Sequence, residues 1–324
     1  MKTILLTGAA GFIGSKTAEL LSGRKNVTVI GVDNVNDYYD VRVKQHRLRA
    51  LKKLPNFTFH KLDIENLSGL KRLFQRYPID AVVNLAARAG VRYSMINPHV
   101  YFTTNTQGTL NLLELCKDFG VKKFVLASTS SLYAGQKMPF TEGLPVNTPI
   151  SSYAASKKAA EVTCYTYHFL YGIDISVVRY FTVYGPAGRP DMCMFRFIKW
   201  IDEGKPMELF GDGSQSRDFT YVDDIAKGTI KALRRVGFEV INLGGGNKPY
   251  SLNYVIQLIE GHLGKQARIK RMAFHKTDIK STWADISKAK QILKWQPRIE
   301  LEEGVKRTVE WYLANRQWLK DVKL

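Results

Sequence analysis

The segment TGAAGFIG, residues 7–14, decides the fold of this chain. Its glycines, Gly8, Gly11 and Gly14, stand three apart between an apolar run at 3–7 and an amphipathic stretch at 13–22. Glycine permits a tight turn, a close approach of the backbone to a pyrophosphate and close packing of helix on strand. Phosphates would lie at the helix N-terminus, where free N–H groups and the helix dipole favour anions. The segment therefore predicts a strand, a dinucleotide-binding loop and a helix.

An acidic residue, Asp33, ends the next apolar run, nineteen residues beyond Gly14. A carboxylate at this position accepts hydrogen bonds from the adenosine ribose hydroxyls and repels a 2′-phosphate. Asp33 therefore favours NAD over NADP as the cofactor. A plainer alternative stays open, in which Asp33 and Asn34 only cap a strand.

Outward from this loop, short apolar runs alternate with amphipathic segments. Near-continuous apolar strands separated by helical patterns indicate a parallel sheet that is covered on both faces. We therefore expect an α/β fold with a Rossmann-type, doubly wound parallel sheet. The predicted strands are 3–7, 27–32, 57–62, 81–85, 123–127, 177–181 and 240–243, and the predicted helices are 13–22, 67–76, 104–119 and 152–171.

The last third of the chain has a different pattern, which we interpret as a smaller lobe over the end of the sheet. It predicts helices at 195–203, 252–263 and 301–322, a strand at 207–210 and a loop at 211–216. The strand at 240–243 is expected to return to the main sheet. We therefore assign residues 1–181, completed by about 219–243, to an NAD-binding domain, and 182–218 with 244–324 to a substrate-binding lobe.

Two further segments follow predicted strands and are candidates for cofactor contact. Asp63 and Ile64 come after the third strand and could hold the adenine edge, although Asp63 could equally be the N-cap of the next helix. The small residues of Leu85-Ala86-Ala87, after the fourth strand, would let the cofactor lie against the backbone.

A tyrosine and a lysine, Tyr153 and Lys157, lie four residues apart and share one face of a predicted helix. A phenol with a pKa of about 10 is a poor base, but an adjacent ammonium and a cationic nicotinamide would favour the phenolate. Thr129 follows the fifth strand, where this type of sheet places its chemistry. The alternative interpretations are a surface helix and a Ser/Thr-rich transition from strand to loop.

These motifs together resemble the extended short-chain dehydrogenase/reductase family of nucleotide-sugar epimerases and dehydratases. The matching segments are TGAAGFIG, STSSLY (128–133), YAASK (153–157), RYFTVYGP (179–186), GSQSRDFTYVDD (213–224) and TWADISKAKQIL (282–293). The resemblance implies an NAD held through whole turnovers, with Phe12, Ile13 and Tyr180 also in its site. It implies a catalytic triad of Thr129, Tyr153 and Lys157, and homodimers packed through helices near 104–119 and 152–171.

The reaction class depends on the residues after Thr129. Dehydratases that resemble this chain carry an Asp-Glu pair there, whereas this chain has Ser130 and Ser131, which cannot act as general acid and base near neutral pH. Hydride removal and return remain, which is what a 4-epimerase needs. The segments AGVRYS (89–94) and RYFTVYGPAGRPDM (179–192) make the resemblance greatest to UDP-glucuronate 4-epimerases. These enzymes form UDP-galacturonate through a 4-keto intermediate.

A carboxylate at carbon 6 of the sugar needs hydrogen-bond donors and positive charge, ideally a guanidinium. Arg189 is our candidate, with Thr182, Ser130 and Ser131 as hydroxyl partners. The resemblance also implies Arg217 at the diphosphate, Phe210 at the uracil and Asp278 at the uridine ribose. We assign no role to Arg88, Arg92 or His275; relatives often carry Gln at position 88 and a neutral polar residue at 275.

Other activities stay open at this point. A UDP-glucuronate decarboxylase shares the cofactor and the substrate but needs further acid–base residues. A UDP-glucose/galactose 4-epimerase would act on neutral sugars. A silent NAD-binding regulator is a third alternative, although the intact triad argues against it.

Composition limits the remaining function classes. The 324 residues carry a formal charge of +19, with basic side chains spread along the chain and no nucleic-acid-binding motif, so we do not expect nucleic-acid binding. No run approaches the ~20 apolar residues of a membrane span, and the first residues are not a signal peptide. The three cysteines lie far apart, which fits the cytoplasm. No metal site is expected.

Overall fold

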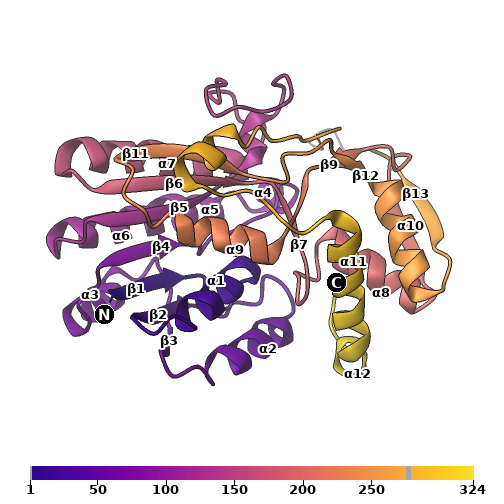
Figure 1. Cartoon of the computed structure of the whole chain (residues 1–324), viewed down its shortest axis with the longest axis horizontal. Coiled ribbons are helices and arrows are strands. Elements are labelled where there is room, and N and C mark those ends of the chain that lie inside the picture. Colours follow the sequence, from indigo (N-terminus) through magenta and orange to yellow (C-terminus); the bar gives the residue numbers. More distant parts are fainter. Residues whose placement is uncertain (1, 275–278) are drawn as a thin grey trace.

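A seven-stranded parallel sheet forms the centre of the protein (Figure 1). The computed structural model describes residues 2–274 and 279–324. The strands lie in the order β11-β6-β5-β4-β1-β2-β3, and β1 pairs with both β2 and β4, which confirms the predicted doubly wound topology. Their bounds are β1 Lys2–Thr7, β2 Val27–Asp33, β3 Phe57–Lys61, β4 Ala81–Asn84, β5 Lys123–Thr129, β6 Asp174–Tyr180 and β11 Phe238–Leu243.

Helices cover both faces of this sheet because successive strand residues point to opposite sides. Leu6 belongs to a core shared with α1 (Phe12–Ser22), α2 (Val41–Leu51) and α9 (Val222–Lys231). Leu5 belongs to the opposite core, which is shared with α3 (Leu67–Arg76), α6 (Gly108–Asp118) and α7 (Ser152–Tyr171). Both cores consist mainly of aliphatic side chains from strands and helices.

The helix predicted over 104–119 is not uniform. A short α5 (His99–Tyr101) leads into a wide π-helical turn, η1 (Phe102–Gln107), and α6 begins only at Gly108. The Asn105 amide in this turn donates to the Arg88 carbonyl and to Ser156 Oγ, both at 3.0 Å, and accepts from Arg88 N at 2.8 Å. These contacts fix the turn between the segment after β4 and α7.

A smaller lobe with its own apolar core adjoins the sheet (Figure 1). Its parallel pair joins β8 (Pro206–Phe210) to β13 (Arg268–Met272). As predicted, β11 returns to the main sheet, where it pairs with β6.

The remaining elements are α4 (Tyr93–Ile96), η2 (Ser130–Tyr133), β7 (Thr182–Tyr184), α8 (Cys193–Asp202), β9 (Ser216–Arg217), β10 (Phe219–Tyr221), β12 (Tyr250–Ser251), α10 (Leu252–Leu263), η3 (Ala289–Leu293), α11 (Leu301–Ala314) and α12 (Arg316–Leu319).

The long helix predicted over 301–322 is interrupted at Asn315, between α11 and α12. The Asn315 side chain donates to the Trp311 carbonyl at 2.8 Å and accepts from the Trp318 indole at 3.0 Å. Local side-chain bonds of this kind compete with continuation of the helix.

The longer helices α2 and α9 were not predicted. Asp40 caps α2 by accepting from Arg42 N, but two of the buried positions of α2 are the cations Lys44 and Arg47, which obscure its apolar periodicity. The first turn of α9 carries Asp223 and Asp224, which suit the positive end of a helix dipole.

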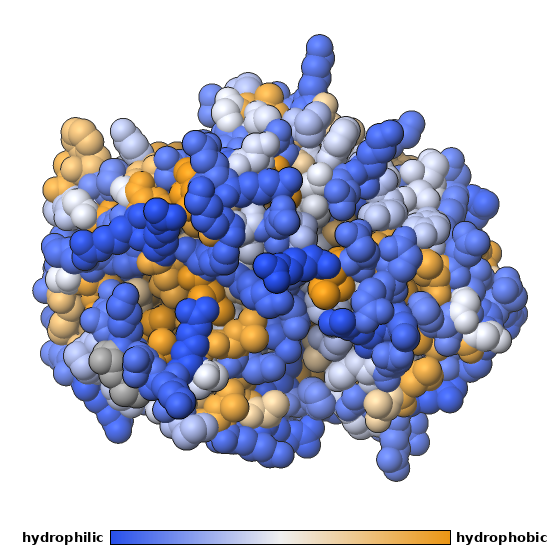
Figure 2. Space-filling model, in the orientation of Figure 1, coloured by the Kyte–Doolittle hydropathy of each residue, from blue (hydrophilic) through white to orange (hydrophobic). Residues whose placement is uncertain are grey.

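The surface is mostly hydrophilic on the face seen in Figure 2, with apolar side chains gathered in a few patches. Within the described residues, each helix is too short or too polar to cross a membrane.

Candidate active site

A cavity of about 400 Å³ lies at the carboxyl ends of the strands, between the sheet and the smaller lobe. Ligands bind at this edge in open α/β sheets. The structure brings most of the predicted site residues together along its wall. They are Gly8, Gly11, Phe12, Ile13, Gly14, Asp33, Asn34, Asp63, Ile64, Leu85, Ala86, Ala87, Thr129, Ser130, Ser131, Tyr153, Lys157, Tyr180, Thr182 and Arg189.

The glycine-rich loop is too tightly folded to accept side chains. Gly8 has φ +70°, and a Cβ added there would stand 2.7 Å from Ala86 N. A Cβ on Gly14 would stand only 2.0 Å from the Gly8 carbonyl oxygen. The loop therefore packs closely against the segment after β4 and against the start of α1, and Gly8, Gly11 and Gly14 line the cavity where a pyrophosphate site would lie.

The Asp33 carboxylate lies beside this loop and is 8% exposed. It accepts hydrogen bonds from Ala10 N at 3.1 Å and from Val35 N at 2.8 Å. Lys44 Nζ of α2 approaches it to 3.8 Å. Burial lowers the pKa of Lys44, and the Asp33 charge opposes that shift.

Asn34 and Asp63 join the ends of β2 and β3. The Asn34 amide donates to Asp63 at 2.6 Å, and Asp63 also accepts from Glu65 N at 2.9 Å. The alternative in which Asp63 caps the next helix is wrong, because the N-cap of α3 is Asn66, whose side chain accepts from Gly69 N.

The three proposed catalytic side chains come from β5 and the first turns of α7. Thr129 ends β5, and its hydroxyl donates to Ser131 Oγ at 3.1 Å. Ser151 caps α7 by accepting from Ala154 N, which places Tyr153 and Lys157 at the start of the helix. Lys157 Nζ donates to the Ala127 carbonyl at 2.9 Å, so the lysine is bonded to the strand that carries Thr129.

Burial shifts both ionisable groups of this set. It raises the pKa of Tyr153, while a hydrogen bond with Thr129 and the charge of Arg189 oppose the rise. It lowers the pKa of Lys157 to about 8, while the Glu161 carboxylate opposes the fall. The lysine therefore keeps its proton at neutral pH, and the phenol needs more positive charge nearby before it can ionise.

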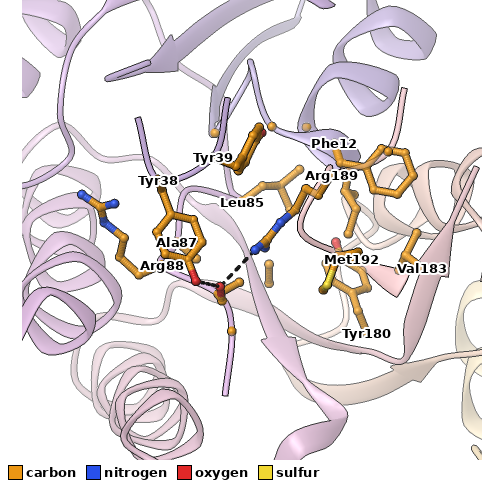
Figure 3. Close-up of a pocket in the computed structure, with 18 of the residues that line it drawn as sticks. Phe12, Tyr38, Tyr39, Leu85, Ala87, Arg88, Tyr180, Val183, Arg189 and Met192 are labelled. Atoms are coloured by element: carbon orange, nitrogen blue, oxygen red, sulfur yellow. Dashed lines mark hydrogen bonds between the residues drawn. The ribbon is translucent and has the colours of Figure 1, made fainter. Parts of the chain in front are cut away.

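Arg189 also lines the cavity, where it lies against an aromatic surface (Figure 3). Its guanidinium lies 5.4 Å from the ring centre of Tyr38 and 5.6 Å from that of Tyr39. It pairs with both oxygens of Asp191 and donates to the Ala89 carbonyl at 3.2 Å. Figure 3 shows Arg88 on the far side of the Tyr38 ring from Arg189.

Two predicted substrate contacts, Phe210 and Arg217, lie elsewhere. Neither of these two described residues forms part of the cavity wall. The Arg92 guanidinium lies 3.9 Å from the ring centre of Phe210, and Arg217 donates to the Ser216 carbonyl at 2.8 Å. Asp278, like the unassigned His275, lies outside the described residues.

Several cavity residues were missed by sequence reasoning. Tyr38, Tyr39 and Lys44 come from the segment that follows Asp33, and Trp311 comes from α11. Asp40 is a typical N-cap residue, and its side chain accepts from Arg42 N at the start of α2. That signal could have revealed α2, and with it the buried Lys44. Sequence patterning offers no signal for Trp311, because its place depends on how the smaller lobe packs.

Known proteins match this chain over nearly its whole length. A sequence model described as the NAD dependent epimerase/dehydratase family matches residues 4–244. A UDP-glucuronate 4-epimerase of Thermodesulfobacterium geofontis is 60% identical over 320 residues, which are 99% of each chain.

Solved structures match it as well. A UDP-glucuronic acid 4-epimerase from Bacillus cereus, in complex with UDP-glucuronic acid and NAD, superposes with a TM-score of 0.90 at 38% identity, covering 97% of this chain and 99% of that one. A UDP-glucose 4-epimerase of Thermotoga maritima with UDP-glucose gives a TM-score of 0.87 at 31% identity, with coverage of 97% and 99%.

Proposed function

The chain belongs to the NAD dependent epimerase/dehydratase family, and on that premise we propose that it is an isomerase that converts UDP-glucuronate into UDP-galacturonate through a 4-keto intermediate. The observation that carries this proposal is the cavity, whose wall holds Thr129, Tyr153 and Lys157 together with Arg189 beside the glycine-rich loop. The 60% identity to a UDP-glucuronate 4-epimerase over almost the whole chain supports it.

The residues of the glycine-rich loop fit NAD. Glycine at positions 8 and 14 lets the loop pack where a Cβ would collide with Ala86 N or with the Gly8 carbonyl. The loop lines the cavity at the start of α1, where a pyrophosphate would lie. Asp33 would accept hydrogen bonds from the ribose hydroxyls. Asn34, Asp63 and Ile64 would flank the adenine. The other residues that would hold NAD are Gly11, Phe12, Ile13, Leu85, Ala86, Ala87, Tyr153, Lys157 and Tyr180. When bound, NAD supplies a hydride acceptor and donor for carbon 4 of the sugar.

Tyr153 would take the proton of the sugar's 4-hydroxyl, and Thr129 would hold the same oxygen. Because burial raises the pKa of Tyr153, its phenolate depends on neighbouring cations. Lys157 carries its charge at neutral pH, since its pKa lies at about 8. In this proposal the lysine acts on the reaction through the phenol, and the charge of Arg189 also favours the phenolate.

Arg189 would bind the carboxylate at carbon 6, with hydroxyls of Ser130, Ser131 and Thr182 nearby. The 4-keto intermediate is a β-keto acid, which loses carbon dioxide when the breaking bond aligns with the ketone π system. A fixed carboxylate can be held out of that alignment. We therefore assign Arg189 the suppression of decarboxylation as well as binding.

The remaining substrate contacts belong to the smaller lobe in this proposal. Arg217 would bind the diphosphate, Phe210 would pack on the uracil and Asp278 would hold the uridine ribose. The residue ranges 182–218 and 244–324 would form the substrate-binding lobe, and 1–181 with about 219–243 the NAD-binding domain. The separate apolar core around α8, α10 and α11 supports this division.

We also propose a cytoplasmic homodimer. On α7, large apolar side chains face outward: Val162 is 52% exposed, Tyr165 53% and Phe169 75%. Contiguous exposed apolar surface of this kind marks protein interfaces, and α6 packs against α7, so the two helices of each protomer could form a four-helix bundle. All three cysteines are unpaired, which suits a reducing compartment.

The direct test is incubation of the purified protein with UDP-glucuronate, followed by identification of the product by NMR. We expect UDP-galacturonate, and we expect Tyr153→Phe to abolish turnover while NAD stays bound. Tyr77→Phe is the control, because its hydroxyl contacts His60 and neither residue is among the described residues that line the cavity. A UDP-pentose with release of carbon dioxide would indicate the decarboxylase instead, and conversion of UDP-glucose alone would indicate a neutral-sugar 4-epimerase.

A further inference from the structure

A buried arginine of α2, Arg47, connects two loops that border the cavity. Arg47 is only 4% exposed. Nη1 donates to the Ala10 carbonyl in the glycine-rich loop at 3.0 Å. Nε and Nη2 donate to the Ala187 carbonyl at 3.0 and 2.6 Å, and Nη2 also donates to the Gly188 carbonyl at 3.1 Å.

Two of the carbonyls that Arg47 binds, those of Ala187 and Gly188, belong to the loop that presents Arg189. Ala187 has φ +54°, a left-handed conformation that is uncommon for a residue with a side chain. Such a conformation persists when surrounding contacts hold it. The planar guanidinium of Arg47, with its fixed fork of donors, supplies such contacts one and two residues before Arg189.

The two arginines also share one aromatic ring. The Tyr39 ring centre lies 5.6 Å from the guanidinium carbon of Arg47 and 5.6 Å from that of Arg189. The Tyr39 hydroxyl accepts from Arg47 Nη1 at 2.6 Å, so Arg47 also sets the orientation of the ring. Both the backbone before Arg189 and the surface on which its side chain rests therefore depend on Arg47.

We propose that Arg47 is a positioning residue for Arg189, and that it sets the preference of the site for a sugar that carries a carboxylate. This inference rests on the proposed function of Arg189. Without Arg47, the loop at residues 187–188 loses its bonds to the glycine-rich loop, and the guanidinium of Arg189 no longer meets the sugar at a fixed place. The proposed contacts to the nucleotide part of the substrate, Arg217 and Phe210, come from β9 and β8 and not from this loop.

The experiment compares the dissociation constants of UDP-glucuronate and UDP by calorimetry on NAD-loaded protein, for wild type, Arg47→Met and Arg189→Ala. We expect Arg47→Met to raise the dissociation constant of UDP-glucuronate about tenfold or more, as the loss of a charged hydrogen bond does. The dissociation constant of UDP should stay within about twofold of the wild-type value, because UDP lacks the carboxylate. We also expect it to raise the decarboxylated fraction of product toward that of Arg189→Ala. Arg49→Met is the control, since Arg49 is exposed on the same helix.

Equal weakening of UDP and UDP-glucuronate, or an unchanged product ratio, would overturn this role and leave Arg47 a purely structural residue. If Arg47→Met does not fold, Arg47→Lys decides by the same comparison, because an ammonium cannot span both sets of carbonyls. The wild-type arm tests the proposed function separately: if wild type itself neither binds nor converts UDP-glucuronate, the function is wrong whatever the variants do.

Discussion

Burial moves the pKa values of Tyr153 and Lys157 in opposite directions, and both shifts work against the charged forms. Taking an ionisable side chain out of water disfavours its charge unless a partner compensates. For Lys157 the Glu161 carboxylate partly compensates, and its ammonium donates to the Ala127 carbonyl at 2.9 Å. The consequence is a lysine whose pKa of about 8 lies close to physiological pH.

The first prediction follows from that pKa. Below pH 8 Lys157 carries its proton and supports the phenolate, and above pH 8 the charge is lost. The kcat of wild type should therefore fall as pH rises through about 8, by about tenfold per pH unit well above that point, as loss of one essential proton requires. Lys157→Arg should be slower, but it should lack this falling limb because a guanidinium keeps its charge. A pH–rate profile checks both, and an identical falling limb in the variant would remove Lys157 from this role.

At the scale of elements, the segment from β1 through the glycine-rich loop to α1 could be predicted because each glycine has a steric reason. The helix α2 could not, since it buries Lys44 and Arg47 among Val43, Leu48 and Leu51. An apolar periodicity search treats those cations as surface residues, whereas here they bond to the Asn36 side chain and to loop carbonyls. Charged residues that serve a site therefore hide the element that carries them.

A matched pair of glycine substitutions tests the loop. Gly14→Ala would place a Cβ 2.0 Å from the Gly8 carbonyl oxygen, so α1 must shift away from the loop. We expect the purified variant to lose its bound NAD, measured by chromatography of the cofactor released on denaturation. Gly261→Ala in α10 meets no described atom within 4 Å. It should keep its NAD and gain about 0.5–1 kcal/mol of unfolding free energy. Equal NAD content in both variants would contradict the proposed cofactor site.

At the scale of the whole molecule, the cavity joins side chains from segments far apart in the sequence. Thr129, Tyr153 and Lys157 could be predicted together because strand and helix motifs fix their places on β5 and α7. Tyr38, Tyr39 and Trp311 could not, because their position depends on how α2, α11 and the sheet pack. The motif residues therefore define the chemistry, while the walls that shape the substrate require the folded chain.

The exposed face of α7 gives a prediction about assembly. Phe169→Glu places a charge in the proposed dimer interface, where burial of an unpaired carboxylate is costly, so we expect monomers in sedimentation velocity runs in which wild type sediments as a dimer. Ile269→Glu is the control, because Ile269 is 43% exposed on β13 in the other lobe. Dissociation by both variants, or by neither, would place the interface elsewhere.

The central claim is that carbon 4 of the sugar gives up a hydride and receives it back within one cavity. The most direct measurement uses UDP-glucuronate labelled with deuterium at carbon 4 and follows the label by NMR after turnover. We predict UDP-galacturonate that retains the deuterium at carbon 4. Loss of the label to water with epimerisation intact would contradict the account, because it would mean that the carbon exchanges a proton.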